Sequence, residues 1–208
     1  MNTEIKELIT AWSKHNIGSL YCQNKEEALK IVLDLIPLDA SIGFSGSATL
    51  DEAGIIESLK KRGNKVFDPY LATLSKEESL AVRKEGALAE YYLASANAIS
   101  QKGELVFFSA FGNRICGVSG AKNVIVICGT NKITSNLEEA IKRAREYATP
   151  LNCKRLNWNT PCAGDGICRK EICLYPEYKR MCCQILVIEA EVSPARLKVI
   201  LVEEKLGF

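Results

Sequence analysis

The amino-acid sequence predicts an α/β fold in which helices flank a mostly parallel sheet. Segments of helical periodicity alternate with short apolar strands between residues 40 and 147, a pattern typical of such folds. The run Val124–Cys128 is continuously apolar and rich in β-branched residues, as in a central strand buried on both faces. Apolar residues make up 47% of the 208 residues and charged residues 25%, so the composition excludes a largely disordered chain.

The first half of the chain is predicted to alternate between helices and two short strands. Apolar side chains at helical spacing mark the first helix, Thr3–Lys14, and Gly18 lies where that helix has ended. The other helices begin at capping residues, and we expect the last of them to run to about Tyr92. The strands span 40–44 and 65–67, and the later helices begin at Asn24, at the capping box Thr49–Glu52 and at the capping box Ser75–Glu78.

The second half is expected to add a hairpin, a long helix and two final strands. Leu105–Phe108 and Ile115–Val118 flank Gly112-Asn113 and therefore predict a hairpin. The capping box Ser135–Glu138 opens a helix to about Tyr147. After an irregular segment at 151–183, strands at 184–191 and 197–203 are expected to return to the same sheet. We expect one domain over 1–208 that includes this segment.

Charge and hydropathy give no sign of a nucleic-acid or membrane partner. The net charge is only +2, and the longest apolar runs fall far short of the ~18 residues that a membrane span needs. The N-terminal stretch carries acidic and basic residues instead of a continuous apolar region, so we expect a cytoplasmic protein. A single histidine, His15, excludes sites that need several imidazoles, and leaves carboxylates, lysines and thiolates as candidate bases.

The loop Gly43–Thr49 between a strand and a capped helix is a candidate anion site. Backbone N–H groups, the positive end of the helix and three hydroxyls would meet there, although an ordinary turn also uses glycine. It is neither a P-loop nor a dinucleotide-binding loop, because the diagnostic glycine and lysine spacings are missing. The predicted ligand-binding residues of this loop are Gly43, Ser45, Gly46, Ser47 and Thr49.

Polar residues at other strand ends are expected to join this loop. Ligands of open α/β sheets bind at the carboxyl ends of the strands, where Lys132 would reach an anion or a carbonyl. Glu52 would act as an acid or base, or simply complete a capping box. Taken singly, the others are also compatible with turn or surface roles. The predicted catalytic residues are Glu52 and Lys132, and the further ligand-binding residues are Asn97, Asn113, Arg114 and Asn131.

Several stretches in a fixed order resemble the LUD family, which is associated with lactate utilization. They are GFSGSATLDEAGI, SANAIS, GELVFFSAFGNR, VIVICGTNKIT, LEEAIKRAR, NTPC, GIC and the ending KVILVEEKLGF. The resemblance runs from about Ile42 to the C-terminus. It implies a fold similar to the NagB/RpiA/CoA-transferase group, in which the equivalent of the Gly43–Thr49 loop holds phosphate or carboxylate groups.

Six of the nine cysteines fall between Cys153 and Cys183, which suggests metal or redox chemistry in a reducing compartment. The thiolates would hold zinc or an iron–sulfur cluster. Their spacing matches neither a zinc ribbon nor a ferredoxin, and the gap between Cys168 and Cys173 is longer than in short members of the LUD family. Reduced structural thiols and a redox disulfide stay open as alternatives. The predicted ligands are Cys162, Cys168, Cys173 and either Cys182 or Cys183.

Three functions are compatible with these features. The first is an accessory or catalytic component of lactate (2-hydroxy acid) oxidation, binding a small anionic molecule and acting with other subunits of a complex or as a homo-oligomer. The second is an enzyme similar to sugar-phosphate isomerases or CoA transferases, with Glu52 as base, Lys132 as electrophile and structural cysteines. The third is a small-molecule sensor or assembly subunit without chemistry.

Overall fold

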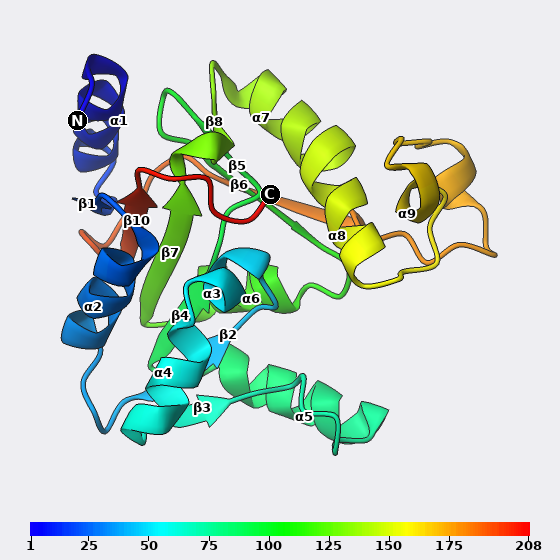
Figure 1. Ribbon diagram of the computed structural model, residues 1–208, viewed down its shortest axis with the longest axis horizontal. Coiled ribbons are helices and arrows are strands. Elements are labelled where there is room, and N and C mark those ends of the chain that lie inside the picture. The colour runs from blue at the N-terminus through cyan, green and yellow to red at the C-terminus, as the bar shows by residue number, and fades with distance from the viewer.

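A computed structural model describes all residues, 1–208, and its centre is a six-stranded, entirely parallel sheet (Figure 1). This confirms the α/β fold with a mostly parallel sheet. The strand β7 lies between β10 and β4, so Val124–Cys128 is central as predicted. In spatial order the strands are β1 (Gly18–Cys22), β10 (Leu197–Val202), β7 (Asn123–Gly129), β4 (Tyr91–Ala94), β2 (Ser41–Phe44) and β3 (Lys65–Phe67).

Both faces of this sheet are covered, because successive side chains of a strand point to opposite sides. In β7, Val124 and Val126 belong to the core cluster that contains Trp12 of the first helix. Ile125 and Ile127 belong to the cluster on the other face. That second cluster is completed by side chains of α2 (Lys25–Leu35) and α4 (Ile55–Arg62), among them Val32 and Leu59.

A second, four-stranded sheet of mixed direction lies beside the first. Its strands are, in order, β8 (Ile133–Thr134), β5 (Ala98–Ser100), β6 (Leu105–Ser109) and β9 (Gln184–Ile188). The prediction that the two final strands of the chain return to the same sheet is therefore wrong. The strand β9 pairs antiparallel with β6 in the second sheet, whereas β10 enters the parallel sheet.

The helices follow local capping signals where such signals exist. Asn2 caps α1, Asn24 caps α2 and Ser75 forms a complete capping box at α5. The helices are α1 (Thr3–Lys14), α2 (Lys25–Leu35), α3 (Ala48–Glu52), α4 (Ile55–Arg62), α5 (Lys76–Ala87), α6 (Asn113–Gly120), α7 (Leu137–Arg143), α8 (Thr149–Arg155) and α9 (Cys162–Asp165), with 3₁₀ turns η1 (Thr130–Lys132) and η3 (Ile172–Leu174) and a π turn η2 (Ala144–Ala148).

The predicted hairpin over 105–118 is wrong. Residues 113–120 form α6, and the antiparallel partners of β6 are β5 and β9. Gly112 begins the helix in a left-handed conformation, φ 78°, which glycine adopts without strain. Gly117 then allows the ring of Tyr92 in the sheet to lie against the helix backbone, since a Cβ there would come within 2.2 Å of that ring. This contact between distant segments outweighs the β-branched character of 115–118.

Other predicted boundaries also differ. The helix expected to reach Tyr92 ends at Ala87, because Tyr91–Ala94 is the strand β4. The helix expected to end near Tyr147 continues through η2 into α8. Pro150 lies in the first turn of α8, where a backbone N–H has no acceptor within that helix, so the N–H that proline lacks is not missed. The true caps of α3 and α7 are Ser47 and Asn136, in place of the predicted boxes. No helix is long and apolar enough to cross a bilayer.

Candidate functional site

A cavity of about 510 Å³ opens where the ends of several elements meet. Its wall contains the residues after β2, the start of α6, one side of α8 and Tyr70. A smaller cavity adjoins it and shares Gly46, Asn97, Arg114 and Asn152 with it. The predicted site residues that line one or both cavities are Ser45, Gly46, Ser47, Thr49, Asn97, Asn113, Arg114 and Lys132.

Arg114 is the central cation of the large cavity. Its Nε donates to Ser45 Oγ at 3.1 Å, its Nη1 to Asn97 Oδ1 at 3.1 Å, and its Nη2 to the Gly46 carbonyl at 2.8 Å. All these acceptors are neutral, and no carboxylate forms an ion pair with this guanidinium. Burial lowers the pKa of Arg114, although arginine keeps its proton at neutral pH. The cavity therefore contains a fixed and uncompensated positive charge.

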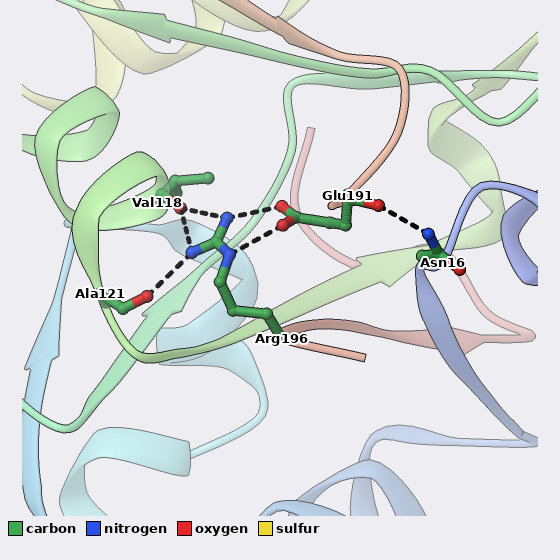
Figure 2. A network of polar contacts seen from close by, with 5 residues as sticks. All are labelled: Asn16, Val118, Ala121, Glu191 and Arg196. Carbon is green, nitrogen blue, oxygen red and sulfur yellow. Dashed lines mark hydrogen bonds and ion pairs between the residues drawn. The ribbon is translucent and has the colours of Figure 1, made fainter. Parts of the chain in front are cut away.

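Arg196 shows what a purely structural arginine looks like in this protein (Figure 2). Its guanidinium forms a bidentate pair with Glu191, with Nη2 to Oε1 at 2.5 Å and Nε to Oε2 at 2.8 Å. The remaining N–H groups donate to the carbonyls of Val118 and Ala121, and Arg196 lines neither of the two cavities. The charge of Arg196 is thus balanced within the fold, whereas that of Arg114 is not.

Lys132 is the second cation of the site and is 2% exposed. Its Nζ donates to Thr49 Oγ1 and Ser95 Oγ, both at 2.8 Å, and to the Ala96 carbonyl at 3.3 Å. None of these acceptors is charged. Burial lowers the pKa of Lys132 from 10.5 to about 8, so its charged and neutral forms are both accessible near physiological pH.

The Gly43–Thr49 loop contributes side chains more than backbone donors. The N–H of Ser45 donates to the Leu93 carbonyl at 3.2 Å, and the N–H of Gly46 donates to the hydroxyl of Tyr70 at 2.6 Å. The predicted cradle of free N–H groups is therefore wrong at these two positions, because the neighbouring strand and an aromatic residue have already satisfied them. The hydroxyl of Ser47 caps α3 through the N–H of Leu50 at 3.4 Å.

Three predicted site residues lie outside both cavities. Gly43 packs directly against the backbone of Gly86 in α5. Glu52 closes no capping box; its Oε2 accepts from the N–H of Gly207 at 2.8 Å. Asn131 holds the same C-terminal segment, accepting from the N–H of Leu206 at 3.1 Å and donating to the Gly207 carbonyl at 3.2 Å. Glu52 and Asn131 thus fix the chain end near the site.

Several lining residues were not predicted, because nothing in their local sequence marks them. Arg83 projects from α5, and Asn152 and Arg155 come from the unexpected helix α8. Phe111 and Trp158 meet edge to face, with ring centroids 6.0 Å apart. Recognition of the helix beyond Pro150 would have placed Asn152 and Arg155 on one face of it, but the aromatic pair joins segments 47 residues apart.

The predicted metal ligands lie around a third and very small cavity. Cys162, Cys168, Cys173 and Cys182 line it, together with Cys153, whereas Cys183 is exposed and elsewhere. No three cysteine, histidine or acidic side chains are arranged to hold a metal ion, so the predicted convergence on one point is not met. Burial raises the pKa of Cys168 and Cys173, which favours protonated thiols that do not draw together.

The chain is similar to one protein family and to several solved structures. The model of the LUD domain matches residues 5–202. A DUF162 family protein from Deinococcus radiodurans has a similar structure, with a TM-score of 0.54, 11% identity and 96% of each chain covered. Ribose 5-phosphate isomerase A from Neisseria gonorrhoeae is similar over 54% of each chain, with a TM-score of 0.35 and 18% identity. Among curated proteins, none matches the chain.

Proposed function

The chain belongs to the LUD domain family, and from that premise we propose that it is an accessory or catalytic component of lactate (2-hydroxy acid) utilization that binds a small anionic ligand. One observation carries the proposal, namely the buried guanidinium of Arg114, which lines the large cavity and has no carboxylate partner. A ligand carboxylate would supply the missing negative charge. Ser45 and Asn97 orient the guanidinium through its Nε and Nη1 atoms.

Lys132 favours a catalytic over a purely accessory role. A buried amine with a pKa of about 8 can hold or release a proton near neutral pH, which suits a general base that takes the hydroxyl proton of such a ligand or a general acid that protonates its carbonyl oxygen. Thr49 and Ser95 fix its Nζ at the wall of the adjoining cavity. Glu52, engaged with Gly207, is a less suitable base than predicted.

Replacement of Arg114 by glutamine tests the proposal directly. We expect the affinity for lactate or pyruvate, measured by isothermal titration calorimetry, to fall roughly 100-fold, because a charge-assisted contact to a buried guanidinium contributes on the order of 3 kcal/mol. Arg114→Lys keeps the charge but loses the planar fork, so its affinity should be intermediate.

Arg196→Gln is the matched control, since it removes a guanidinium of similar burial that a carboxylate already balances. We expect Arg196→Gln to lower the unfolding temperature and to leave ligand affinity unchanged. Lys142→Gln, which replaces an exposed lysine, should alter neither quantity. Equal affinity of the wild-type protein and Arg114→Gln for both acids would contradict an anion site at Arg114.

The cysteine cluster is proposed to hold zinc or an iron–sulfur cluster. Its donor chemistry fits either, and a bound metal ion would displace the protons of thiols whose pKa burial raises in its absence. The thiols would have to draw together on binding. The cluster shares Thr149 and Met181 with the wall of the large cavity, which supports a metal site beside the proposed ligand.

We expect anaerobically purified protein to contain about one zinc ion or one iron–sulfur centre per chain, measured by elemental and acid-labile sulfide analysis. Cys168→Ser should abolish this content, whereas Cys183→Ser, which changes an exposed thiol outside the cavity, should retain it. Metal-free wild-type protein with nine titratable thiols would refute the metal site.

We propose that the protein is cytoplasmic, because the reducing environment there would keep all nine cysteines free. We also propose that it associates either with other subunits of a lactate-oxidising complex or with further copies of the chain.

A further inference from the structure

The ligand cavity is larger than lactate requires. Its volume is about 510 Å³. Lactate has only six non-hydrogen atoms and would displace no more than about six waters, or roughly 180 Å³. A cavity of several hundred Å³ is instead typical of sites that enclose a ligand with a ring or long side chain. Aromatic and apolar side chains border the space that lactate would leave unfilled.

The aromatic side chains of Tyr70, Phe111 and Trp158 line that wall, and the guanidinium of Arg83 lies against the first two. Arg114 donates to the Gly46 carbonyl, and the N–H of Gly46 donates to the Tyr70 hydroxyl. The guanidinium of Arg83 lies 4.9 Å from the centre of the Tyr70 ring and 5.9 Å from that of Phe111. Phe111 in turn meets Trp158 edge to face. An apolar and aromatic surface therefore extends from the cation that binds the acid.

Phe111 is unusual because a large aromatic side chain in this wall is left 66% exposed. Apolar residues such as Leu50, Ile56 and Met181 line the same cavity. Exposed apolar surface gathered in a concave site marks a place where a ligand removes it from water. A flat ring on Phe111 and Trp158 would do so and would gain the edge or stacking contacts that aromatic pairs favour.

The charges of the wall agree with an acid at one end of the ligand. The carboxylates that line it already have partners: Asp51 pairs with Arg155, and Lys60 bridges Asp68 and Glu57. The cations Arg83 and Arg114 have no acidic partner. With Lys60 counted, four cations (Arg83, Arg114, Arg155 and Lys60) stand against the three carboxylates, so the net charge of the wall is +1, which favours an anionic ligand over a zwitterionic or cationic one.

We propose that the preferred ligand is a 2-hydroxy or 2-oxo acid with an aromatic side chain, bound with its carboxylate on Arg114 and its ring on Phe111 and Trp158. This inference rests on the proposed function, because it takes the anion site at Arg114 as given and adds the identity of the side chain. Three-carbon lactate would use the acid end of the cavity and leave the aromatic wall in water.

Four probes separate the two parts of the inference: lactate, 3-phenyllactate, propane-1,2-diol and 3-phenylpropane-1,2-diol. Affinities for the full-length protein are measured by calorimetry and by quenching of Trp158 fluorescence. We expect 3-phenyllactate to bind at least 30-fold more tightly than lactate, equivalent to about 2 kcal/mol. Phe111→Ala should weaken the binding of 3-phenyllactate at least tenfold more than it weakens the binding of lactate, and Phe111 is exposed enough for the variant to fold. Leu88→Ala, which trims an exposed apolar residue outside the cavity, should change neither affinity.

If the two acids bind with equal affinity and each binds more tightly than its diol, the preference for an aromatic ligand side chain is overturned and the proposed function stands. Acids that bind no better than their diols would overturn the anion site and, with it, both proposals. A ring preference that survives both Phe111→Ala and Trp158→Leu would overturn the placement of the ring on this wall.

Discussion

Replacement of Gly43 by alanine is expected to destabilise the protein by about 3 kcal/mol or more, although it adds only one methyl group. A Cβ at this position would lie 1.8 Å from the carbonyl oxygen of Gly86 and 2.5 Å from its carbonyl carbon. Both atoms belong to the backbone of α5, so no change of rotamer can relieve the clash. The strand β2 and the helix would have to separate, and the packing of Phe67 against Gly86 would be lost.

The free energy of unfolding in urea measures this effect. Gly120→Ala is the control, because a Cβ there meets nothing within 4 Å and the residue ends a helix without a positive φ. Its stability should equal or slightly exceed that of the wild-type protein. A Gly43→Ala variant within about 0.5 kcal/mol of wild type would show that β2 and α5 do not approach as closely as described.

Gly43 also illustrates how far sequence reasoning extends in this protein. The loop that contains it was identified by its composition, and its neighbours Ser45, Gly46 and Ser47 do line the cavities. The sequence does not distinguish a glycine that admits a ligand from a glycine that admits another backbone. That distinction depends on Gly86, which is 43 residues away and belongs to a different element.

Elements were predicted well where their signals are local. The periodicity of α1, the cap of α2 and the capping box of α5 all depend on residues within four positions of one another. The strand β4 was missed because Tyr91–Ala94 follows a good helix without a breaking residue, and only its pairing with β2 and β7 makes it a strand. The helix α6 was missed for a similar reason, namely the contact of Gly117 with Tyr92.

The polar part of the candidate site could be anticipated because strand ends of a parallel sheet gather at one edge. Lys132 follows β7 of this parallel sheet and reaches Thr49 in the segment after β2, whereas Arg114 follows β6 of the second, mixed sheet and reaches Ser45. The aromatic wall could not be anticipated. Phe111 and Trp158 lie in irregular segments, and their meeting depends on the course of α8 past Pro150.

Replacement of Lys132 by methionine is expected to make the protein more stable at pH 7 while weakening anion binding at least tenfold. The pKa of this buried amine is lowered from 10.5 to about 8, so the folded protein carries a charge that costs on the order of 1 to 3 kcal/mol below pH 8. Methionine fills a similar volume without that charge. The hydroxyls of Thr49 and Ser95 keep other partners, the carbonyls of Leu206 and Ala96 respectively.

The gain should depend on pH in a way that identifies its cause. Below pH 8 Lys132 is protonated in both the folded and the unfolded chain, so the cost of its buried charge is constant. Between about pH 8 and pH 10.5 the unfolded chain binds the proton that the folded chain has released, so the stability of the wild-type protein rises with pH and the advantage of Lys132→Met shrinks.

Urea unfolding of both proteins at pH 7 and pH 10 measures this difference, and Lys142→Met, at an exposed lysine, should show none. An advantage of equal size at both pH values would mean that packing alone explains the gain. A shrinking advantage combined with lost anion binding would show that the fold retains a destabilising charge because the site uses it.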